Sequence, residues 1–484
     1  MSSQRLVWIP RRVLFAHSAG YACVLLFLLT GCATFDQRAG FADVSAAVEA
    51  RSAKRLVWNL GTELDTQATQ NVRNLLADAL TADKAVQVAL LSNRELQAMY
   101  AELGVAQADL VQAGLLTNPV FDGAALFPLA GGPVGLDLSV AMSFLDMFYL
   151  PLRQRVAKAQ FEAVKLQVTG AVLDFAAAVQ TAFYRHQADV QMLELHQTMT
   201  HALATALDAA QRLHAAGNIT DLDLARERAV AEEAKLQLRA AETTVRESRE
   251  QLNALMGLWG EETVWHTQSR LPDLPKEPLS LSGLEAWALR ESLDLASARQ
   301  RMMAAGEALG VNRATAYLSE VDVGAGAERD DGAWKVGPLL ELPVPLFDQG
   351  QGRTGRALAE LRRTQQDYYA LGVRIRAAAR TVLERVQGAE DRVRYARDIF
   401  LPLLERIVHE TQLQYNAMQL GVFELLRARE QQIRAAMMYI EALRDYWLAR
   451  TDLGQLLSGR LPSPNGIAMG QKEAFNLRRE NAGH

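Results

Sequence analysis

The feature that most constrains this fold is the stretch from residue 153 to residue 214, which contains no proline and a single glycine, Gly170. It is rich in Ala, Leu, Gln, Glu and Arg, which are good helix formers. At 1.5 Å of rise per residue, one continuous helix of this length would reach about 90 Å. A short break follows at residues 217–220, where Thr220 or Asp221 can cap a second helix. The sequence therefore predicts a long helical hairpin.

The second half of the chain repeats this plan, with predicted helices over residues 356–415 and 422–457 and a break between them. An offset of 201 residues aligns identical residues of the two halves: Leu224 with Leu425, Arg226 with Arg427, Arg228 with Arg429, Ala241 with Ala442, Leu252 with Leu453, and Leu255 with Leu456. A duplicated unit of about 200 residues explains this better than convergent helical composition. The copies differ at Pro402, which aligns with His201, so only the second copy is expected to kink there.

Each copy also contains two short segments of another character between its helices. Period-two alternation around turns rich in Gly, Pro and Asp predicts a β-hairpin in each copy. The expected strands lie within residues 118–144 and 320–346, as 118–127 and 134–144 in the first copy and 320–328 and 334–346 in the second. Strands of about ten residues suit a tilted membrane strand, although a soluble sheet would give the same local pattern.

Four strands cannot close a barrel, so insertion into a membrane would require several copies of the chain. One alternating set of strand residues should then face lipid. Val321, Val323 and Ala325 form a candidate set, but the sequence does not fix which face is outward.

Composition excludes several classes of protein. Of the 484 residues, 49% are hydrophobic and 22% are charged, as in a folded chain rather than a disordered one. The formal net charge of -5 provides no basic field for nucleic acid. We find no apolar run after residue 32 that is long enough for a transmembrane helix.

Motifs for enzymatic or metal chemistry are weak. Residues 350–355 fit a dinucleotide-binding glycine pattern, but no second parallel strand follows, so we interpret them as a strand-to-helix turn. Helical histidines, including His186 and His214, lack metal-site spacing and are expected on the solvated helix surface. Paired methionines at 302–303 and 437–438 are expected to fill the core. We therefore expect no enzymatic activity, cofactor or metal site.

The N-terminus has the layout of a secretory signal, with a basic start and an apolar run over residues 24–29. The sequence Leu29-Thr30-Gly31-Cys32 resembles a bacterial lipobox, which implies that Cys32 becomes the first mature residue and carries lipid. Ala33 in place of aspartate suggests export to the outer membrane. An ordinary signal peptide or a single membrane anchor would be the alternative. The mature body would then hold no thiol, because the chain has only two cysteines.

Ordered motifs in both halves resemble the TolC-type outer-membrane efflux proteins, the outer membrane factors, in their lipoprotein branch. Residues 108–119 (Ala-Asp-Leu-Val-Gln-Ala-Gly-Leu-Leu-Thr-Asn-Pro) resemble the run that leads into the first strand of that family. Residues 344–353 (Val-Pro-Leu-Phe-Asp-Gln-Gly-Gln-Gly-Arg) resemble its exit from the last strand into a helix. Residues 221–224 and 423–426 resemble the starts of its returning tip helices. The resemblance covers roughly residues 80–460.

The resemblance implies a mainly α fold with a small β part, built from a duplicated unit of long helical hairpins. It implies a homotrimer in which each protomer gives four strands to a 12-stranded barrel in the outer membrane, which continues into a periplasmic α-helical tube. Such a tube docks onto a periplasmic adaptor protein and an inner-membrane pump, and conducts substrate outward passively. The implied location is the bacterial outer membrane, anchored by lipid.

The hairpin tips are the candidate periplasmic gate. They bring together Asp221, Asp223 and Glu424, and threefold symmetry would turn these carboxylates into rings that favour cations. In the resembling family an acidic ring lies here, and Glu424 matches its first position. Arg427 departs from the next position, and Arg226 is its counterpart in the first copy, so Arg–carboxylate bonds could hold the tips instead. Simple helix capping is a further interpretation.

We divide the chain into six parts. The first three are a signal peptide (1–31), an N-terminal periplasmic segment (32–83) and a first repeat (84–270). A linker (271–284), a second repeat (285–460) and a flexible tail (461–484) follow. One rival to the channel is a monomeric periplasmic structural or adaptor-like lipoprotein without a pore. Another is an envelope enzyme, which the lack of an acid–base constellation disfavours. The sequence does not decide between drugs, metal ions, peptides and other cargo.

Overall fold

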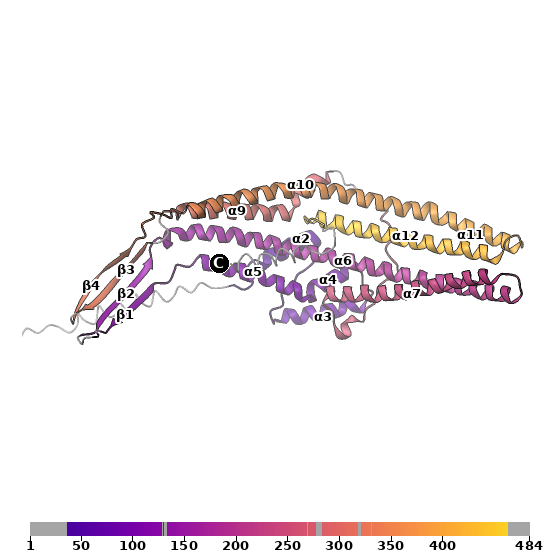
Figure 1. Cartoon of the computed structure of the whole chain (residues 1–484), viewed down its shortest axis with the longest axis horizontal. Helices are drawn as coiled ribbons and strands as arrows, with labels where there is room; N and C mark the ends of the chain where they lie inside the picture. The colour runs from indigo at the N-terminus through magenta and orange to yellow at the C-terminus, as the bar shows by residue number, and fades with distance from the viewer. Residues whose placement is uncertain are drawn as a thin grey trace, which may run out of the picture.

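The computed structural model describes residues 36–462, with the exception of residues 128, 130–132, 269, 277–282, 318–320 and 331. The predicted signal peptide, Cys32 and nearly all of the predicted tail lie outside the described residues. The described part is elongated, with a small sheet at one end, two helical hairpin tips at the other end, and shorter helices around the middle (Figure 1).

The first half of the chain supplies the longest helix. Its helices are α2 (Phe41–Ser52), α3 (Glu63–Ala77), α4 (Ala82–Ser92), α5 (Arg94–Ala113), α6 (Asp146–Ala215) and α7 (Asp221–Met256), followed by the 3-10 turn η1 (Gly260–Thr263). At 70 residues, α6 is about 105 Å long. The predicted hairpin is therefore present as α6 and α7, and α6 begins seven residues before the predicted start at residue 153.

The second half repeats the order of elements. It contains α8 (Leu284–Glu291), α9 (Leu293–Ala314), α10 (Gln351–Tyr395), the π-helical turn η2 (Ala396–Phe400), α11 (Leu401–Asn416) and α12 (Val422–Leu457). Pro402 is the second residue of α11, which follows η2 directly. Proline has no N–H for an α-helical bond, and its ring clashes with the carbonyl four residues earlier, so the preceding turn widens. The predicted kink at Pro402 thus corresponds to a π-helical turn in the second copy, whereas α6 runs unbroken through the aligned His201.

The junctions at the middle of the molecule show the duplication in three dimensions. Asn93 caps α5 and Ser292 caps α9, each by accepting hydrogen bonds from backbone N–H groups two or three residues later. A glycine with positive φ ends the returning helix of each copy, Gly257 after α7 and Gly459 after α12. A side chain on Gly257 would come within 2.9 Å of the Asn93 backbone, and one on Gly459 would overlap the carbonyl oxygen of Glu291. Both glycines are therefore needed for close packing against the capped junction.

The core is built around α6. One buried cluster joins α6 to α2, α3, α4, α5 and the end of α7, and a second joins it to α8, α10 and α12. By length and composition alone, α6 is also apolar enough to cross a membrane, so the expectation that no such run follows residue 32 is wrong on that measure. Half of its most apolar window is buried inside the protein, which explains that composition as helix packing.

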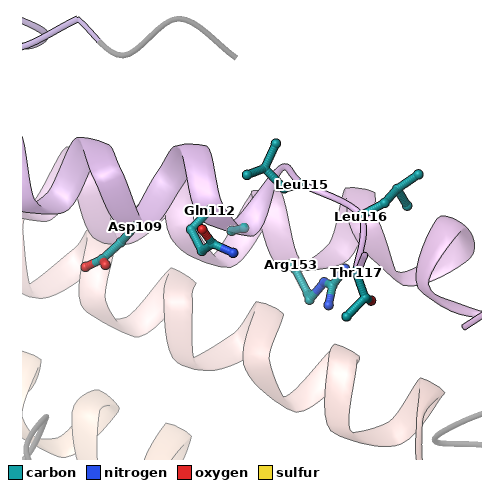
Figure 2. Close-up of a pocket in the computed structure, with 7 residues that line it drawn as sticks. Asp109, Gln112, Leu115, Leu116, Thr117 and Arg153 are labelled. Atoms are coloured by element: carbon teal, nitrogen blue, oxygen red, sulfur yellow. The ribbon is translucent and has the colours of Figure 1, made fainter. Parts of the chain in front are cut away.

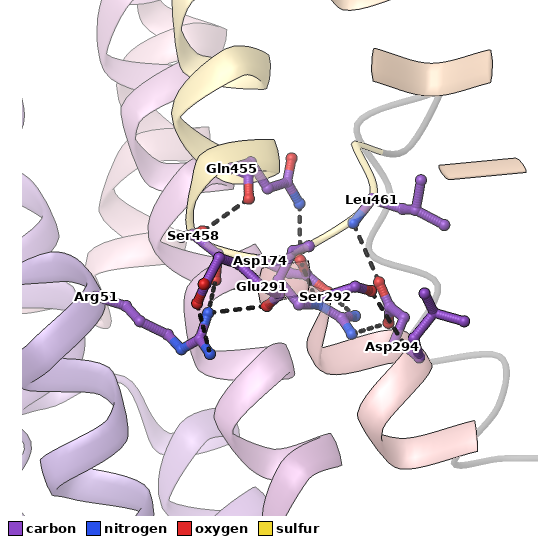
Figure 3. A network of polar contacts seen from close by, with 10 residues as sticks. Arg51, Asp174, Glu291, Ser292, Asp294, Gln455, Ser458 and Leu461 are labelled. Atoms are coloured by element: carbon purple, nitrogen blue, oxygen red, sulfur yellow. Dashed lines mark hydrogen bonds and ion pairs between the residues drawn. The ribbon is translucent and has the colours of Figure 1, made fainter. Parts of the chain in front are cut away.

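A partly buried ionic cluster ties the two halves together (Figure 3). The guanidinium of Arg460, just after α12, pairs with Asp174 of α6 and with Asp294 of α9. Gln455 donates to Asp174 at 2.7 Å, and the backbone N–H of Leu461 donates to Asp294 at 3.2 Å. We call Arg460, Asp174 and Asp294 the Arg460 clasp, because it joins α6 of the first repeat to the start of α9 and to the end of the second repeat.

Contacts around the clasp explain why a glycine is present at position 170 and an arginine at position 51. A side chain at Gly170, the single glycine of the predicted helical stretch, would come within 2.7 Å of the Arg460 guanidinium. Arg51 of α2 donates to the carbonyl oxygens of Glu291 and Ser458 at 3.1 and 2.9 Å. The N-terminal helix is thus held to the second repeat beside the clasp.

Candidate functional site: the strand sheet and the hairpin tips

The four strands form one antiparallel sheet in the order β1-β2-β3-β4. Their bounds are β1 (Val120–Leu126), β2 (Gly135–Ser143), β3 (Asp322–Asp330) and β4 (Ala333–Glu341). β3 runs two residues past its predicted end. β4 stops five residues before its predicted end, because Pro343 and Pro345 cannot donate to a strand ladder. β1 and β4 are the two edges of this sheet, so each has one side without a strand partner.

The register sorts the strand residues onto two faces, since directly paired residues share a face and neighbours along a strand alternate. One face is nearly all apolar. It carries Phe121, Gly123, Ala125, Leu136, Leu138, Val140, Met142, Val323, Ala325, Ala327, Arg329, Trp334, Val336, Pro338 and Leu340. The predicted set Val323 and Ala325 lies on this face, while Val321 precedes β3.

Arg329 is the charged residue on the apolar face, and it lies at the end of its strand, where a membrane strand tolerates a charge. Arg329 lies beside the β3–β4 turn, with its guanidinium 6.0 Å from the ring centre of Trp334. Arginine at such a position can extend its head group to the membrane surface, and Trp is typical of that level. The apolar face therefore has the chemistry of a lipid-facing surface.

The opposite face is polar. Its carboxylates are Asp122, Asp137, Asp322, Glu328, Asp330 and Glu341, and the rest of the face is Lys335, serines, glycines, alanines and three larger aliphatic residues. Alternation of an apolar face with a polar face is the pattern of strands in an outer-membrane barrel.

Gly350 marks the return from the sheet into α10. Its φ is +71°, and a side chain there would come within 2.9 Å of the Ala316 backbone. The glycine-rich run is therefore a tight strand-to-helix turn, as interpreted from the sequence. It opens a 45-residue helix beside an antiparallel sheet, unlike a βαβ unit.

A shallow hollow lies between the end of α5 and the start of α6 (Figure 2). Its volume is about 370 Å³, and its lining includes Asp109, Gln112, Thr117 and Arg153. Arg153 is paired with Asp146 at 3.3 Å. The lining contains no histidine, cysteine or lysine, so it offers no nucleophile–base pair of the usual kind.

The first tip, between α6 and α7, is closed by local bonds. Gly217 takes a φ of +75° in the turn. Thr220 and Asp223 form a capping box with a side-chain contact of 2.7 Å, and this hydrogen bond with Thr220 holds the pKa of Asp223 below its usual range. Asp221 contacts His214 at 2.7 Å, and Arg226 lies 3.6 Å from Asp223.

The second tip, between α11 and α12, lies at the same end of the molecule (Figure 1). Met418 takes a φ of +60° at the position aligned with Gly217. Glu424 accepts from Arg427 at 3.1 Å within the same helix. The structure therefore brings all five tip candidates to one end, and pairs Arg226 and Arg427 with carboxylates of their own helices.

Two histidines differ from the expectation of a solvated helix surface: His186 is buried, and His214 contacts a carboxylate at the first tip. His186 is 2% exposed, shares a 2.9 Å hydrogen bond with Ser248 and packs edge-on against Trp265. Burial, with help from the nearby Arg249, lowers its pKa to about 4. His214 contacts the tip residue Asp221, a contact that was not predicted from the sequence, although the spacing of seven residues across the turn could have indicated it. In the described residues, no group of three His, Cys, Asp or Glu side chains is placed to hold a metal ion.

Comparison with known proteins agrees with this architecture. The sequence profile of the family described as "Outer membrane efflux protein" matches residues 85–258. The cobalt-zinc-cadmium resistance protein CzcC of Cupriavidus metallidurans is 23% identical over 390 residues, which cover 79% of this chain and 90% of CzcC.

Solved structures have the same fold. The CusC crystal structure aligns with a TM-score of 0.63 and 15% identity, covering 80% of this chain and 92% of CusC. The open state of the Neisseria gonorrhoeae MtrE outer membrane channel aligns with a TM-score of 0.61 and 18% identity, covering 78% of this chain and 89% of MtrE. The predicted fold class is confirmed: the chain has the fold of these outer membrane channels, with duplicated helical hairpins and four strands.

Proposed function

We propose that this chain is the outer-membrane channel component of a tripartite efflux or secretion system, and that it conducts substrate passively from the periplasm to the exterior. The observation that carries the proposal is the four-stranded sheet, with one apolar and one polar face and two free edges, at the end of a long helical body. The family match supports the channel over a pore-free structural protein.

Closure of the pore requires a homotrimer. Unpaired strand edges are not tolerated in lipid, and three copies would join β4 of one protomer to β1 of the next. The helices offer matching edges, since α6 packs between α7 and α12, and α12 packs against α10 and α11. A head-to-tail contact therefore places first-half elements against second-half elements and can close into a ring.

The charge of these helical edges favours the same contact. α7 contains eight acidic and six basic residues, whereas α10 contains ten arginines and five acids. Opposite net charge on two facing surfaces guides association and register.

Two measurements on detergent-purified protein test this proposal. Native mass spectrometry should show a trimer, and the same sample should conduct ions in planar lipid bilayers. A folded monomer that stays soluble without detergent and conducts nothing would instead support the periplasmic structural alternative.

The lipid-facing assignment has its own test. Ala325→Arg places a charge in the middle of the apolar face and should cost about 2–4 kcal/mol if that face meets the bilayer midplane. Gly326→Arg, one residue along and on the polar face, is the matched control. Equal loss of assembled trimer in both variants would contradict the assignment.

We propose that Cys32 is acylated and anchors the chain to the outer membrane. Cys32→Ser should then abolish incorporation of a radioactive fatty acid and leave a protein of precursor size. Normal labelling of this variant would exclude the anchor.

We propose that the tip end faces the periplasm, where an adaptor and an inner-membrane pump would engage it, and that the Glu424–Arg427 and Asp223–Arg226 pairs restrict the closed end. Glu424→Ala and Arg427→Ala should then raise single-channel conductance or change its block by divalent cations. Unchanged conductance and block in both variants would reduce these residues to helix caps.

A further inference from the structure

Two hollows adjoin where the helices meet the sheet, and one of them is polar while the other is apolar. We infer that together they bind a zwitterionic phospholipid of the periplasmic leaflet, with its phosphate at Arg153, its ammonium group at Asp109 and part of an acyl chain in the apolar hollow. This inference rests on the proposed channel function, because a membrane-inserted sheet brings both hollows to the level of lipid. It assigns a class of ligand to a site that conduction itself does not require.

The polar hollow is the one between α5 and α6 (Figure 2). Arg153 lines it from α6, while Asp109 and Gln112 line it from α5 at a spacing of about one helical turn. One cation and one carboxylate therefore share a space of about 370 Å³. This is the charge pattern that a headgroup with one phosphate and one ammonium group requires.

Arg153 has donors that the protein does not use. Its Nη1 pairs with Asp146 at 3.3 Å. Its Nε and Nη2 are buried and have no hydrogen-bond acceptor among the described residues. Buried donors without an acceptor are costly, and a cationic donor more so.

The two unused donors suit a phosphate. The N–H groups of Nε and Nη2 lie along the same edge of the guanidinium plane, so two oxygens of one phosphate can accept from both. Such bidentate contacts are the usual way in which arginine binds phosphate. A headgroup phosphate would therefore supply the acceptors that the described residues do not.

Asp109 distinguishes between kinds of headgroup. It is exposed on α5 and has no ion-pair partner among the described residues. A carboxylate in the same hollow as the phosphate-binding arginine disfavours a purely anionic headgroup, because like charges repel. It can accept a charge-assisted hydrogen bond from the ammonium group of a zwitterionic headgroup.

The apolar hollow would hold the lipid tail. Leu116 lines both hollows, so they adjoin at this residue. The apolar hollow has a volume of about 160 Å³, and its other lining residues are Met142, Ser143, Phe144, Met147 and Val323. Met142 and Val323 are paired on the apolar face of the sheet. The tail would therefore continue directly onto the surface assigned to lipid.

The depth of the site fits the headgroup level. The apolar band of an outer-membrane barrel is about 25 Å tall, and the nine residues of β2 reach about the same height when tilted by about 35–45°. The exposed Met147 and Phe148 continue the apolar surface just past the strands. Arg153 lies about 9 Å beyond Met147 along α6, where the polar region of the leaflet is expected.

The test is native mass spectrometry of the full-length trimer in detergent, after addition of phosphatidylethanolamine or of phosphatidylglycerol with the same acyl chains. The wild-type trimer should retain one phosphatidylethanolamine per protomer and prefer it to phosphatidylglycerol. Arg153→Gln should weaken retention at least about tenfold, which corresponds to about 1.4 kcal/mol. Asp109→Asn changes an exposed side chain, so it should fold normally, and it should reduce the preference for phosphatidylethanolamine about threefold.

Arg155→Gln is the matched control. Arg155 lies two residues further along the same helix, and its ion pair is with Glu307 at 3.9 Å, so this variant should bind both lipids as the wild type does. Met147→Gln alters the apolar hollow and should weaken both lipids to a similar extent. Inorganic phosphate in excess should not displace the lipid, because it has no acyl chain.

The outcomes separate this inference from the proposed function. A conducting trimer that binds phosphatidylglycerol as well as phosphatidylethanolamine, or that binds lipid equally in Arg153→Gln and Arg155→Gln, would overturn the inference and leave the channel intact. Displacement of the lipid by inorganic phosphate would show a general anion site and overturn it too. A protein that forms no conducting trimer would contradict the channel itself.

Discussion

The two halves of the chain share one order of elements but occupy different environments. Twenty-one of the 70 residues of α6 are buried, compared with six of the 45 residues of α10. α6 contributes to both core clusters, while α10 contributes only to the second and runs along one long side of the molecule (Figure 1). The same ancestral helix has therefore become a central helix in one copy and an outer helix in the other.

Residues at aligned positions of the two repeats reflect this difference in burial. His186 is buried where the second repeat has the exposed Gln387, and α6 is continuous at His201 where Pro402 follows a π-helical turn. At the tips, Gly217 and Met418 both adopt a positive φ, of +75° and +60°. Backbone geometry is kept between the copies, and side chains follow the local environment.

The largest effect is expected where the halves are joined. Arg460→Met keeps the packing of the stem but leaves the buried Asp174 and the half-buried Asp294 without their cation. Loss of one partner from a buried ion cluster costs about 3–5 kcal/mol. Thermal and chemical unfolding followed by circular dichroism should show this loss.

The control for the clasp is Arg434→Ala, which removes an exposed pair with Glu430 in α12. Such pairs contribute about 0–1 kcal/mol. If both substitutions had the same small effect, the two repeats would not depend on the clasp.

Exchange of the proline between the repeats should be almost as costly. His201→Pro places a proline in the interior of α6, where no widened turn receives it, and should cost about 3 kcal/mol. Pro402→His in the second repeat should have a much smaller effect, because it restores a backbone donor. Equal stability changes for the two variants, measured by urea unfolding, would mean that α6 is no more rigid there than α11.

The buried imidazole should make the first repeat sensitive to pH. The pKa of His186 is lowered to about 4, so the unfolded chain binds its proton at higher pH than the folded chain does. The free energy of unfolding should therefore fall as pH drops from about 6.5 to 4, by up to about 3 kcal/mol from this group.

His186→Gln introduces the residue found at the aligned position of the second repeat and should flatten this part of the stability profile. Stability measured from pH 4 to 7 for both proteins isolates the contribution of the imidazole, since the other titrating groups are shared. Identical pH slopes would show that His186 is protonated freely in the folded state.

The smallest expected effects are at the tips. Met418→Gly should stabilise the second tip by up to about 1 kcal/mol, because a left-handed backbone is unfavourable for a residue with a side chain. Gly217→Met should destabilise the first tip by a similar amount. Hydrogen exchange of the turn amides measures both, and changes of the same sign would contradict the shared tip geometry.

Much of the fold could be predicted because its signals are local and repeated. The long hairpins follow from the lack of proline and glycine, and the π-helical turn follows from Pro402. The strand hairpins follow from alternation, although β4 ends earlier than predicted because the prolines after it cannot donate.

The rest depends on contacts between distant segments. The Arg460 clasp joins residues 286 and 166 positions apart, and neither half of the chain alone contains a signal for it. The burial of His186 depends on which helices cover α6. The polar and apolar faces of the sheet become clear only when the register of all four strands is known.

The most direct test of the channel is a spin-label scan of β3 in reconstituted membranes. The mature body is expected to contain no other thiol, so single cysteines at Asp322, Val323, Ala325, Gly326, Ala327 and Glu328 can each carry one label. Labels at Val323, Ala325 and Ala327 should contact oxygen in the lipid phase, while labels at Asp322, Gly326 and Glu328 should contact a water-soluble relaxing agent. Equal access of the water-soluble agent to both sets would contradict a membrane-spanning sheet.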